Sequence, residues 1–128
     1  LPPADVLERQ VLDIYAPSLY CYHTKAANPS EVLRTGLYVQ AQLDEAARVK
    51  RLYGRPDALI LPFIWYMRHD QASPLDIEYW EMVLRICLDE DHGNDGAILW
   101  AAWGVPWDEN APWWVTIKAR LTDKRRTG

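Results

Sequence analysis

The chain has 128 residues, and 49% of them are hydrophobic, a share typical of a packed globular chain rather than a disordered one. Its formal net charge of -4 gives no general attraction for nucleic acid or for an anionic membrane. The longest apolar run, from Ala58 to Met67, is broken by Pro62 and is too short to span a bilayer, which takes about 20 residues. These features predict one segment, residues 1–128, that has neither nucleic acid nor a membrane as its partner.

Three apolar runs predict strands near residues 11–22, 58–66 and 96–103. None of the runs alternates apolar with polar side chains, so burial on both faces, as in a parallel α/β sheet, fits them best. Helices are predicted near residues 37–53, 74–90 and 113–121. This strand-helix alternation favours an α/β fold with parallel strands and right-handed crossovers, in either a doubly wound sheet or a barrel.

The first two predicted helices carry recognisable end signals. Gly54 supplies a C-terminal stop for the first. Before the second, Ser73-Pro74-Leu75-Asp76 offers an N-cap hydroxyl, a proline at the first helical position and a carboxylate three residues after the cap. We therefore expect Ser73 to cap the second helix.

Aromatic side chains stand at the carboxyl ends of all three predicted strands. Binding sites of parallel α/β folds gather there because the connecting loops converge. An aromatic face suits the apolar C–H patch of a pyranose, and Tyr hydroxyls or Trp N–H groups bond its oxygens. Each ring alone is more typical of a core position, but their recurrence predicts a carbohydrate site. The candidate residues are Tyr20, Tyr22, Tyr66, Asp70, Trp100 and Trp103.

Several short motifs follow one another between Ile14 and Trp103. They are Pro17-Ser18-Leu19-Tyr20, Tyr38-Val39-Gln40, Glu45-Ala46-Ala47-Arg48-Val49, Leu61-Pro62, Leu75-Asp76, and Gly96-Ala97-Ile98-Leu99-Trp100 with Trp103. In order and approximate spacing they resemble the second half of the hyaluronidase family of glycoside hydrolases. The resemblance implies a partial TIM barrel, namely the C-terminal part of a catalytic (β/α)₈ domain that needs roughly 250 residues when complete.

The same resemblance implies a retaining β-N-acetylhexosaminidase. In such an enzyme the substrate's acetamido oxygen attacks the anomeric carbon while a glutamic acid protonates the leaving oxygen. The resemblance implies that Tyr20 is the catalytic tyrosine that hydrogen-bonds the acetamido group, and that Trp100 is the wall beneath the reacting sugar. The family's glutamate lies in a strand-end Asp-x-Glu motif, which this sequence lacks. The chain alone is therefore predicted to bind polysaccharide without hydrolysing it.

Some positions depart from the family pattern. Asp70 is matched to a polar cleft residue, but the loop there is shorter than in the animal enzymes. Phe63 stands where a tyrosine usually follows Leu-Pro, so one hydroxyl is lost. Cys21 and Cys87 do not match the animal enzymes' disulfide pattern, which favours a divergent, microbial relative.

The histidines are interpreted as structural side chains. His23 and His69 could serve as polar cleft residues or general acid–base groups, but a surface or capping role is preferred for both. His92 is expected at a helix C-terminus, where the helix dipole favours it. Because no histidine pair has zinc spacing and no nucleotide-binding motif occurs, neither a metal nor another cofactor is expected.

Two alternatives stay open beside a glycosidase segment. One is a non-catalytic, hydrolase-like scaffold or carbohydrate-recognition module within a larger assembly. The other is a half-barrel that stands alone. Its open sheet edges and uncovered apolar face would then be paired by self-association or by the remaining barrel half.

Overall fold

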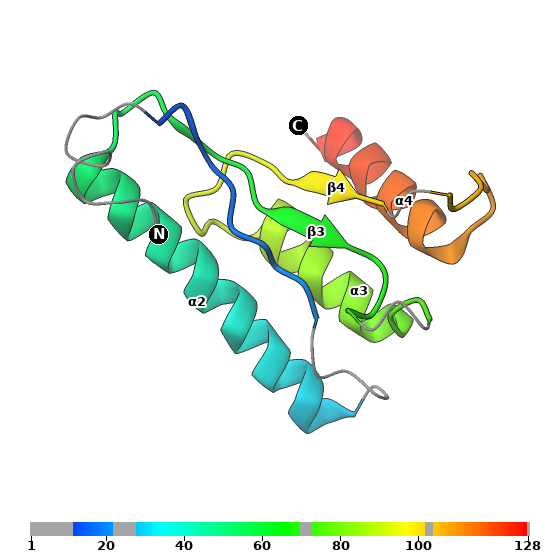
Figure 1. Ribbon diagram of the computed structural model, residues 1–128. Coiled ribbons are helices and arrows are strands. Elements are labelled where there is room, and N and C mark those ends of the chain that lie inside the picture. Colours follow the sequence, from blue (N-terminus) through cyan, green and yellow to red (C-terminus); the bar gives the residue numbers. More distant parts are fainter. Residues whose placement is uncertain (1–11, 22–27, 70–72, 102–103, 128) are drawn as a thin grey trace.

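The computed structural model describes residues 12–21, 28–69, 73–101 and 104–127, the last four without their side chains. Strands and helices alternate along the chain (Figure 1). The elements are β1 (Ile14–Tyr15), α2 (Pro29–Tyr53), β2 (Leu59–Ile60), β3 (Phe63–Trp65), α3 (Ile77–Leu84), the π-helical turn η1 (Arg85–Asp89), β4 (Ile98–Trp100) and α4 (Pro112–Thr127). Within the described ranges, no helix combines the length and the apolar character needed to cross a bilayer.

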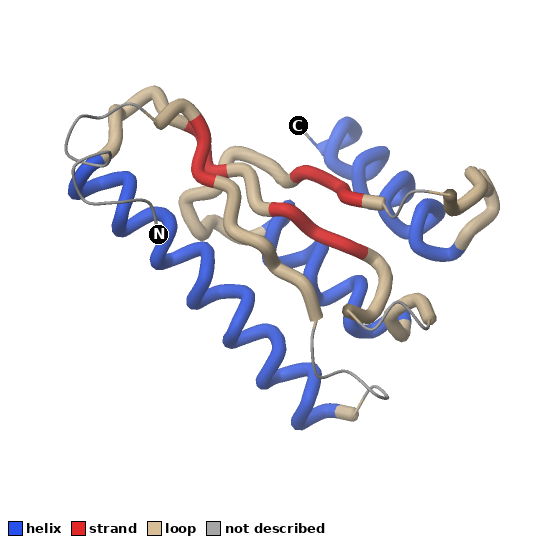
Figure 2. Tube along the Cα trace, viewed as in Figure 1, coloured by secondary structure: helices blue, strands red, loops and turns tan. Residues whose placement is uncertain are grey.

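The strands are short and parallel, which confirms the predicted strand direction. β1 pairs with β2, and β3 pairs with β4. Beyond β1 the chain continues alongside β3, because the Phe63 N–H donates to the Pro17 carbonyl and the Leu19 N–H donates to the Phe63 carbonyl, each at 2.9 Å. Three extended segments therefore lie side by side in chain order, with the strands drawn in red in Figure 2.

The described helices form one layer, in which α3 packs against both α2 and α4. The main core lies between this layer and the sheet. Its buried side chains include Leu19, Ile64 and Tyr66 from the extended segments, Val39 and Leu43 from α2, Trp80 and Leu84 from α3, and Ile117 from α4. Burial of a side chain of this size stabilises the fold by about 1.5–3 kcal/mol.

The other face of the sheet is apolar and open in the described part of the chain. Ile14 lies opposite Leu59 in the β1–β2 pair, so both side chains point to the same face, and they are 48% and 42% exposed. Their neighbours Tyr15 and Ile60 are buried beneath the helices. The sequence predicted burial on both faces, whereas the described residues cover only one.

The helix ends differ from the predictions for local reasons. α2 begins at Pro29, well before residue 37, because the Asn28 Oδ1 accepts a hydrogen bond from the Glu31 N–H at 3.0 Å. α3 begins at Ile77 rather than at Pro74. Its N-cap residue is Asp76 and not Ser73. The Ser73 carbonyl accepts the Arg68 N–H at 3.0 Å as the chain folds back on the end of β3, before the helix begins.

Candidate functional site

Three aromatic rings from the three extended segments meet at the carboxyl end of the sheet. Trp65 and Trp100 are register partners in the β3–β4 pair, so they point to the same face, and their ring centroids lie 4.7 Å apart at 87°. The Tyr20 ring lies 5.6 Å from the Trp65 ring and 6.1 Å from the Trp100 ring. We call Tyr20, Trp65 and Trp100 the rim triad.

The triad combines a buried support with an open ring. Trp65 is only 3% exposed, whereas Trp100 is 38% exposed and Tyr20 is partly buried. The Trp65 Nε1 is buried and has no hydrogen-bond partner among the described residues. The contact with the buried Trp65 therefore holds the Trp100 ring in place while part of Trp100 stays accessible.

His69 extends this group. Its ring stacks on Tyr20 with centroids 6.4 Å apart and an interplanar angle of 26°. The His69 N–H donates to the Cys21 carbonyl at 3.2 Å, which ties the end of the second segment to the first. His69 is exposed, as expected from sequence, and it also lies beside the triad, in keeping with the less favoured prediction of a polar cleft residue.

Tyr66 does not join the triad. It is 4% exposed and lies on the helix side of the sheet, where its ring stacks on Trp113 at 4.2 Å and 8°. Adjacent residues of a strand point to opposite faces, so Trp65 rather than Tyr66 reaches the open face. The other candidates, Tyr22, Asp70 and Trp103, lie outside the described residues.

A second aromatic group joins the loop after β4 to the first turn of α4. Trp107 is 65% exposed, and its ring lies 6.0 Å from that of Trp113 and 5.0 Å from that of Trp114. The Trp80 Nε1 donates to the Trp113 carbonyl at 3.0 Å and so anchors this group to α3. The sequence showed only a tryptophan-rich loop here. The closeness in sequence of Trp107 to the pair Trp113-Trp114 was the available signal.

No protein-family model and no curated protein matches this sequence. Among solved structures, bee venom hyaluronidase matches with a TM-score of 0.60 and 24% identity, over 87% of this chain and 33% of that chain. The fold is hyaluronidase-like. Bee venom hyaluronidase in complex with hyaluronic acid tetramer also matches, with a TM-score of 0.58 and 23% identity over 89% of this chain and 31% of that one. The chain thus spans about a third of the length of these hyaluronidases.

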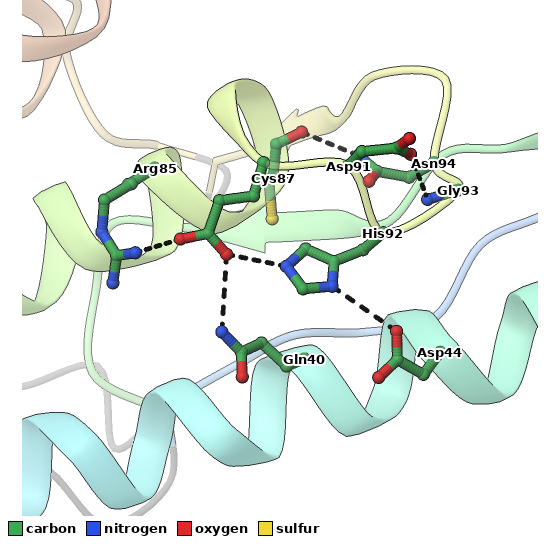
Figure 3. A network of polar contacts seen from close by, with 9 residues as sticks. Gln40, Asp44, Arg85, Cys87, Asp91, His92, Gly93 and Asn94 are labelled. Atoms are coloured by element: carbon green, nitrogen blue, oxygen red, sulfur yellow. Dashed lines mark hydrogen bonds and ion pairs between the residues drawn. The ribbon is translucent and has the colours of Figure 1, made fainter.

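A network of polar contacts lies in the loop before β4, at the amino end of the sheet (Figure 3). Glu90 accepts hydrogen bonds from Arg85, from the Gln40 Nε2 at 3.4 Å and from the His92 Nε2 at 2.7 Å. The other ring nitrogen of His92 lies 3.5 Å from the Asp44 carboxylate. These contacts join α2 to the loop before β4, so we interpret the network as structural. His92 pairs with carboxylates of the loop and of α2, instead of with the helix dipole that the sequence suggested.

These contacts shift the pKa values of Glu90 and His92. The hydrogen bond from His92 lowers the pKa of Glu90, with the nearby Arg85 also contributing. The hydrogen bond to Glu90 raises the pKa of His92, and the contact with Asp44 raises it further. Each partner therefore favours the charged form of the other.

The described residues hold no group of three or more His, Cys, Asp or Glu side chains that could bind a metal ion. Cys21 and Cys87 are free and buried, and burial raises the pKa of each thiol to about 12. Neither thiol is therefore suited to act as a nucleophile. The chemistry that the carboxyl end of the sheet can perform is recognition by aromatic faces and by the Tyr20 hydroxyl.

Proposed function

We propose that the chain is part of a hyaluronidase-like glycosidase and supplies one side of its substrate cleft. The ligand would be a polysaccharide that contains N-acetylhexosamine. The observation that carries the proposal is the rim triad, in which rings from three segments far apart in sequence meet at the carboxyl end of a parallel sheet. This end is where parallel α/β enzymes place their sites.

Each member of the triad has a proposed role. Trp100 offers its open ring face to the apolar side of the sugar, because aromatic rings pack well against pyranose C–H groups. The Tyr20 hydroxyl hydrogen-bonds the acetamido group and so positions its oxygen for attack on the anomeric carbon. Trp65 is a positioning residue that fixes the other two rings. Tyr22, Asp70 and Trp103 remain proposed neighbours of this cleft.

The barrel assignment is part of the proposal. A doubly wound sheet carries helices on both faces, whereas the described helices lie in one layer and leave an apolar face open. That arrangement suits a segment of a (β/α)₈ barrel, whose interior would be completed by further strands. The similarity to bee venom hyaluronidase supports this reading, and that protein's complex with hyaluronic acid tetramer supports a polysaccharide ligand.

The chain itself should not hydrolyse the polysaccharide, because residues 1–128 contain no strand-end Asp-x-Glu to protonate the leaving group. The lack of this motif in residues 1–128 also agrees with the second candidate function, a carbohydrate-recognition module that binds sugar through the same triad. A strand-end Asp-x-Glu elsewhere in the protein would favour the glycosidase over the module.

Calorimetric titration of the chain with an N-acetylhexosamine disaccharide tests the triad directly. We expect binding with little or no release of new reducing ends. Trp100→Ala should weaken binding at least about tenfold, which corresponds to ~1.4 kcal/mol, because a buried aromatic contact is lost. The matched control is Leu33→Ala, which truncates an exposed apolar side chain of α2 and should leave the affinity unchanged.

The result that would overturn the proposal is absence of binding in the parent chain. Equal affinities of the parent and Trp100→Ala would remove the triad as the site. Near-ultraviolet circular dichroism of each variant shows whether it retains the parent packing, so that loss of binding is not read from an unfolded chain.

A further inference from the structure

Trp107 is a large apolar side chain that the folded chain holds out toward solvent. It lies in the loop beyond the carboxyl end of β4, the same end of the sheet that bears the rim triad (Figure 1). Trp113 and Trp114 meet its ring at 84° and 67°, in edge-to-face contacts, and 65% of the residue stays exposed. Two tryptophans thus support the Trp107 ring without covering it.

The backbone around Trp107 is also fixed. The Asp108 Oδ1 accepts the Asn110 N–H at 2.9 Å, and the Asp108 carbonyl accepts the Ala111 N–H at 3.1 Å. The Ala111 carbonyl then accepts the Trp114 N–H at 3.0 Å as α4 begins. A ring held in this way binds a flat partner at little cost in conformational entropy.

The end of β3 connects Trp107 to the rim triad. Trp65 belongs to the triad, and the next residue, Tyr66, stacks on Trp113. Trp113 in turn contacts Trp107. Trp65 and Tyr66 point to opposite faces of the sheet, so what the two aromatic groups share is their place at its carboxyl end, where a polysaccharide chain could reach both.

The charges beside Trp107 restrict the kind of sugar. Asp108 and Glu109 are exposed and follow Trp107 directly. Arg68, which follows β3, has its guanidinium 3.8 Å from the Asp76 carboxylate. A uronate carboxylate would be repelled by Asp108 and Glu109 at close range, whereas the hydroxyls of an uncharged sugar can donate hydrogen bonds to them.

We propose that Trp107, with Asp108 and Glu109, forms a second sugar platform that binds an uncharged unit of the polysaccharide held at the rim triad. The inference rests on the proposed function, because it extends the same cleft. It identifies the substrate class as a neutral N-acetylhexosamine polymer in preference to one with a uronate on every second sugar, such as hyaluronan.

The test is calorimetry on the full 128-residue chain with three probes: a disaccharide and a hexasaccharide of N-acetylglucosamine, and a hyaluronan hexasaccharide. Trp107→Ala should weaken binding of the neutral hexasaccharide about fivefold or more and change disaccharide binding less than about twofold. Val105→Ala, an apolar truncation in the same loop, is the matched control and should change neither affinity.

The charge component has its own variant. The parent should bind the neutral hexasaccharide more tightly than the hyaluronan hexasaccharide. The double variant Asp108→Asn, Glu109→Gln should raise the hyaluronan affinity about threefold or more at low salt, because surface repulsion is weakly screened there. Equal affinity of the parent for both hexasaccharides, unchanged in the double variant, would overturn the assignment to a neutral polymer.

Each failure has a distinct pattern. If Trp100→Ala abolishes binding while Trp107→Ala leaves hexasaccharide affinity unchanged, the second platform is wrong and the proposed function stands. If the parent binds none of the probes, both are wrong. If Trp107→Ala does not fold, a measurement on the parent chain replaces it. In the parent, the hexasaccharide should reduce acrylamide quenching of tryptophan fluorescence more than the disaccharide does. Equal protection by the two sugars contradicts the platform.

Discussion

Trp65 and Tyr66 are adjacent in the chain, yet they lie on different faces of the sheet and have different surroundings. Tyr66 lies under the helix layer, stacked on Trp113 and next to Trp80. Trp65 points to the face that the described helices leave open, where it supports Trp100. The covered face holds the main core, whereas the open face leaves side chains such as Trp100, Ile14 and Leu59 partly exposed. Substitutions on the two faces should therefore affect different measurements.

The largest effect is expected on the covered face. Tyr66→Ala removes a buried ring from the core and should lower the free energy of unfolding by about 3–5 kcal/mol, measured by urea denaturation. Tyr66→Phe keeps the ring and serves as the control, with a loss of less than about 1.5 kcal/mol. Normal disaccharide binding by Tyr66→Phe would agree with a core role. Loss of disaccharide binding in a stably folded Tyr66→Phe variant would instead show that the Tyr66 hydroxyl takes part in binding.

On the open face the expected effect is on association rather than on folding. Ile14 and Leu59 form an exposed apolar pair, and large exposed patches favour association. We expect light scattering to show a mass above that of one chain at high concentration, and Leu59→Lys to lower it toward the monomer. A monomeric parent at all concentrations would contradict this use of the face. Leu52→Lys, on α2, is the matched control.

The smallest effect is expected at the amino end of the sheet, where polar groups are paired. Because the folded-state pKa of His92 is raised above 6.5, its contribution to stability is present below pH 6.5 and is lost as the pH rises through the folded value. Because the folded-state pKa of Glu90 is lowered below 4.5, its contribution is present above pH 4.5 and is lost as the pH falls. The pair should therefore stabilise the fold most between these two values.

His92→Gln tests this interval. The variant should lose part of the parent's decline in melting temperature between pH 6 and pH 9, and the stability difference at pH 6 should be small, because the pair is partly exposed. Ligand binding at the rim triad should be unaffected. Identical pH profiles of the parent and His92→Gln would show that the contact with Glu90 and Asp44 does not contribute to stability.

Some of the site was predictable because it depends on chain order alone. Tyr20 and Trp100 lie near the carboxyl ends of predicted strands, and the ends of successive parallel strands converge whatever the details of packing. Trp65 was missed and Tyr66 was chosen because the run from Ala58 to Trp65 is apolar throughout. In such a run no polar residue marks the positions that point away from the core, so the sequence does not show which face of the sheet each side chain lies on.

The second aromatic group was missed for a related reason. Trp107 follows Gly104 and Pro106 in a loop, and a loop sequence carries no periodicity from which exposure could be inferred. The cap at Ser73 was predicted from a pattern that is common before helices, but the backbone there is used in pairing with the chain after β3. Local patterns compete with tertiary hydrogen bonds, and here the tertiary contact determines the start of α3.

The sequence by itself determined the alternation of strands and helices, their parallel direction and the aromatic character of the strand ends, because these depend on local periodicity and on order along the chain. Only the tertiary structure decided which rings meet, which face stays open and that Trp107 is supported but uncovered. Those properties depend on register and on which neighbours pack against each face, and both are set by contacts between residues far apart in the chain.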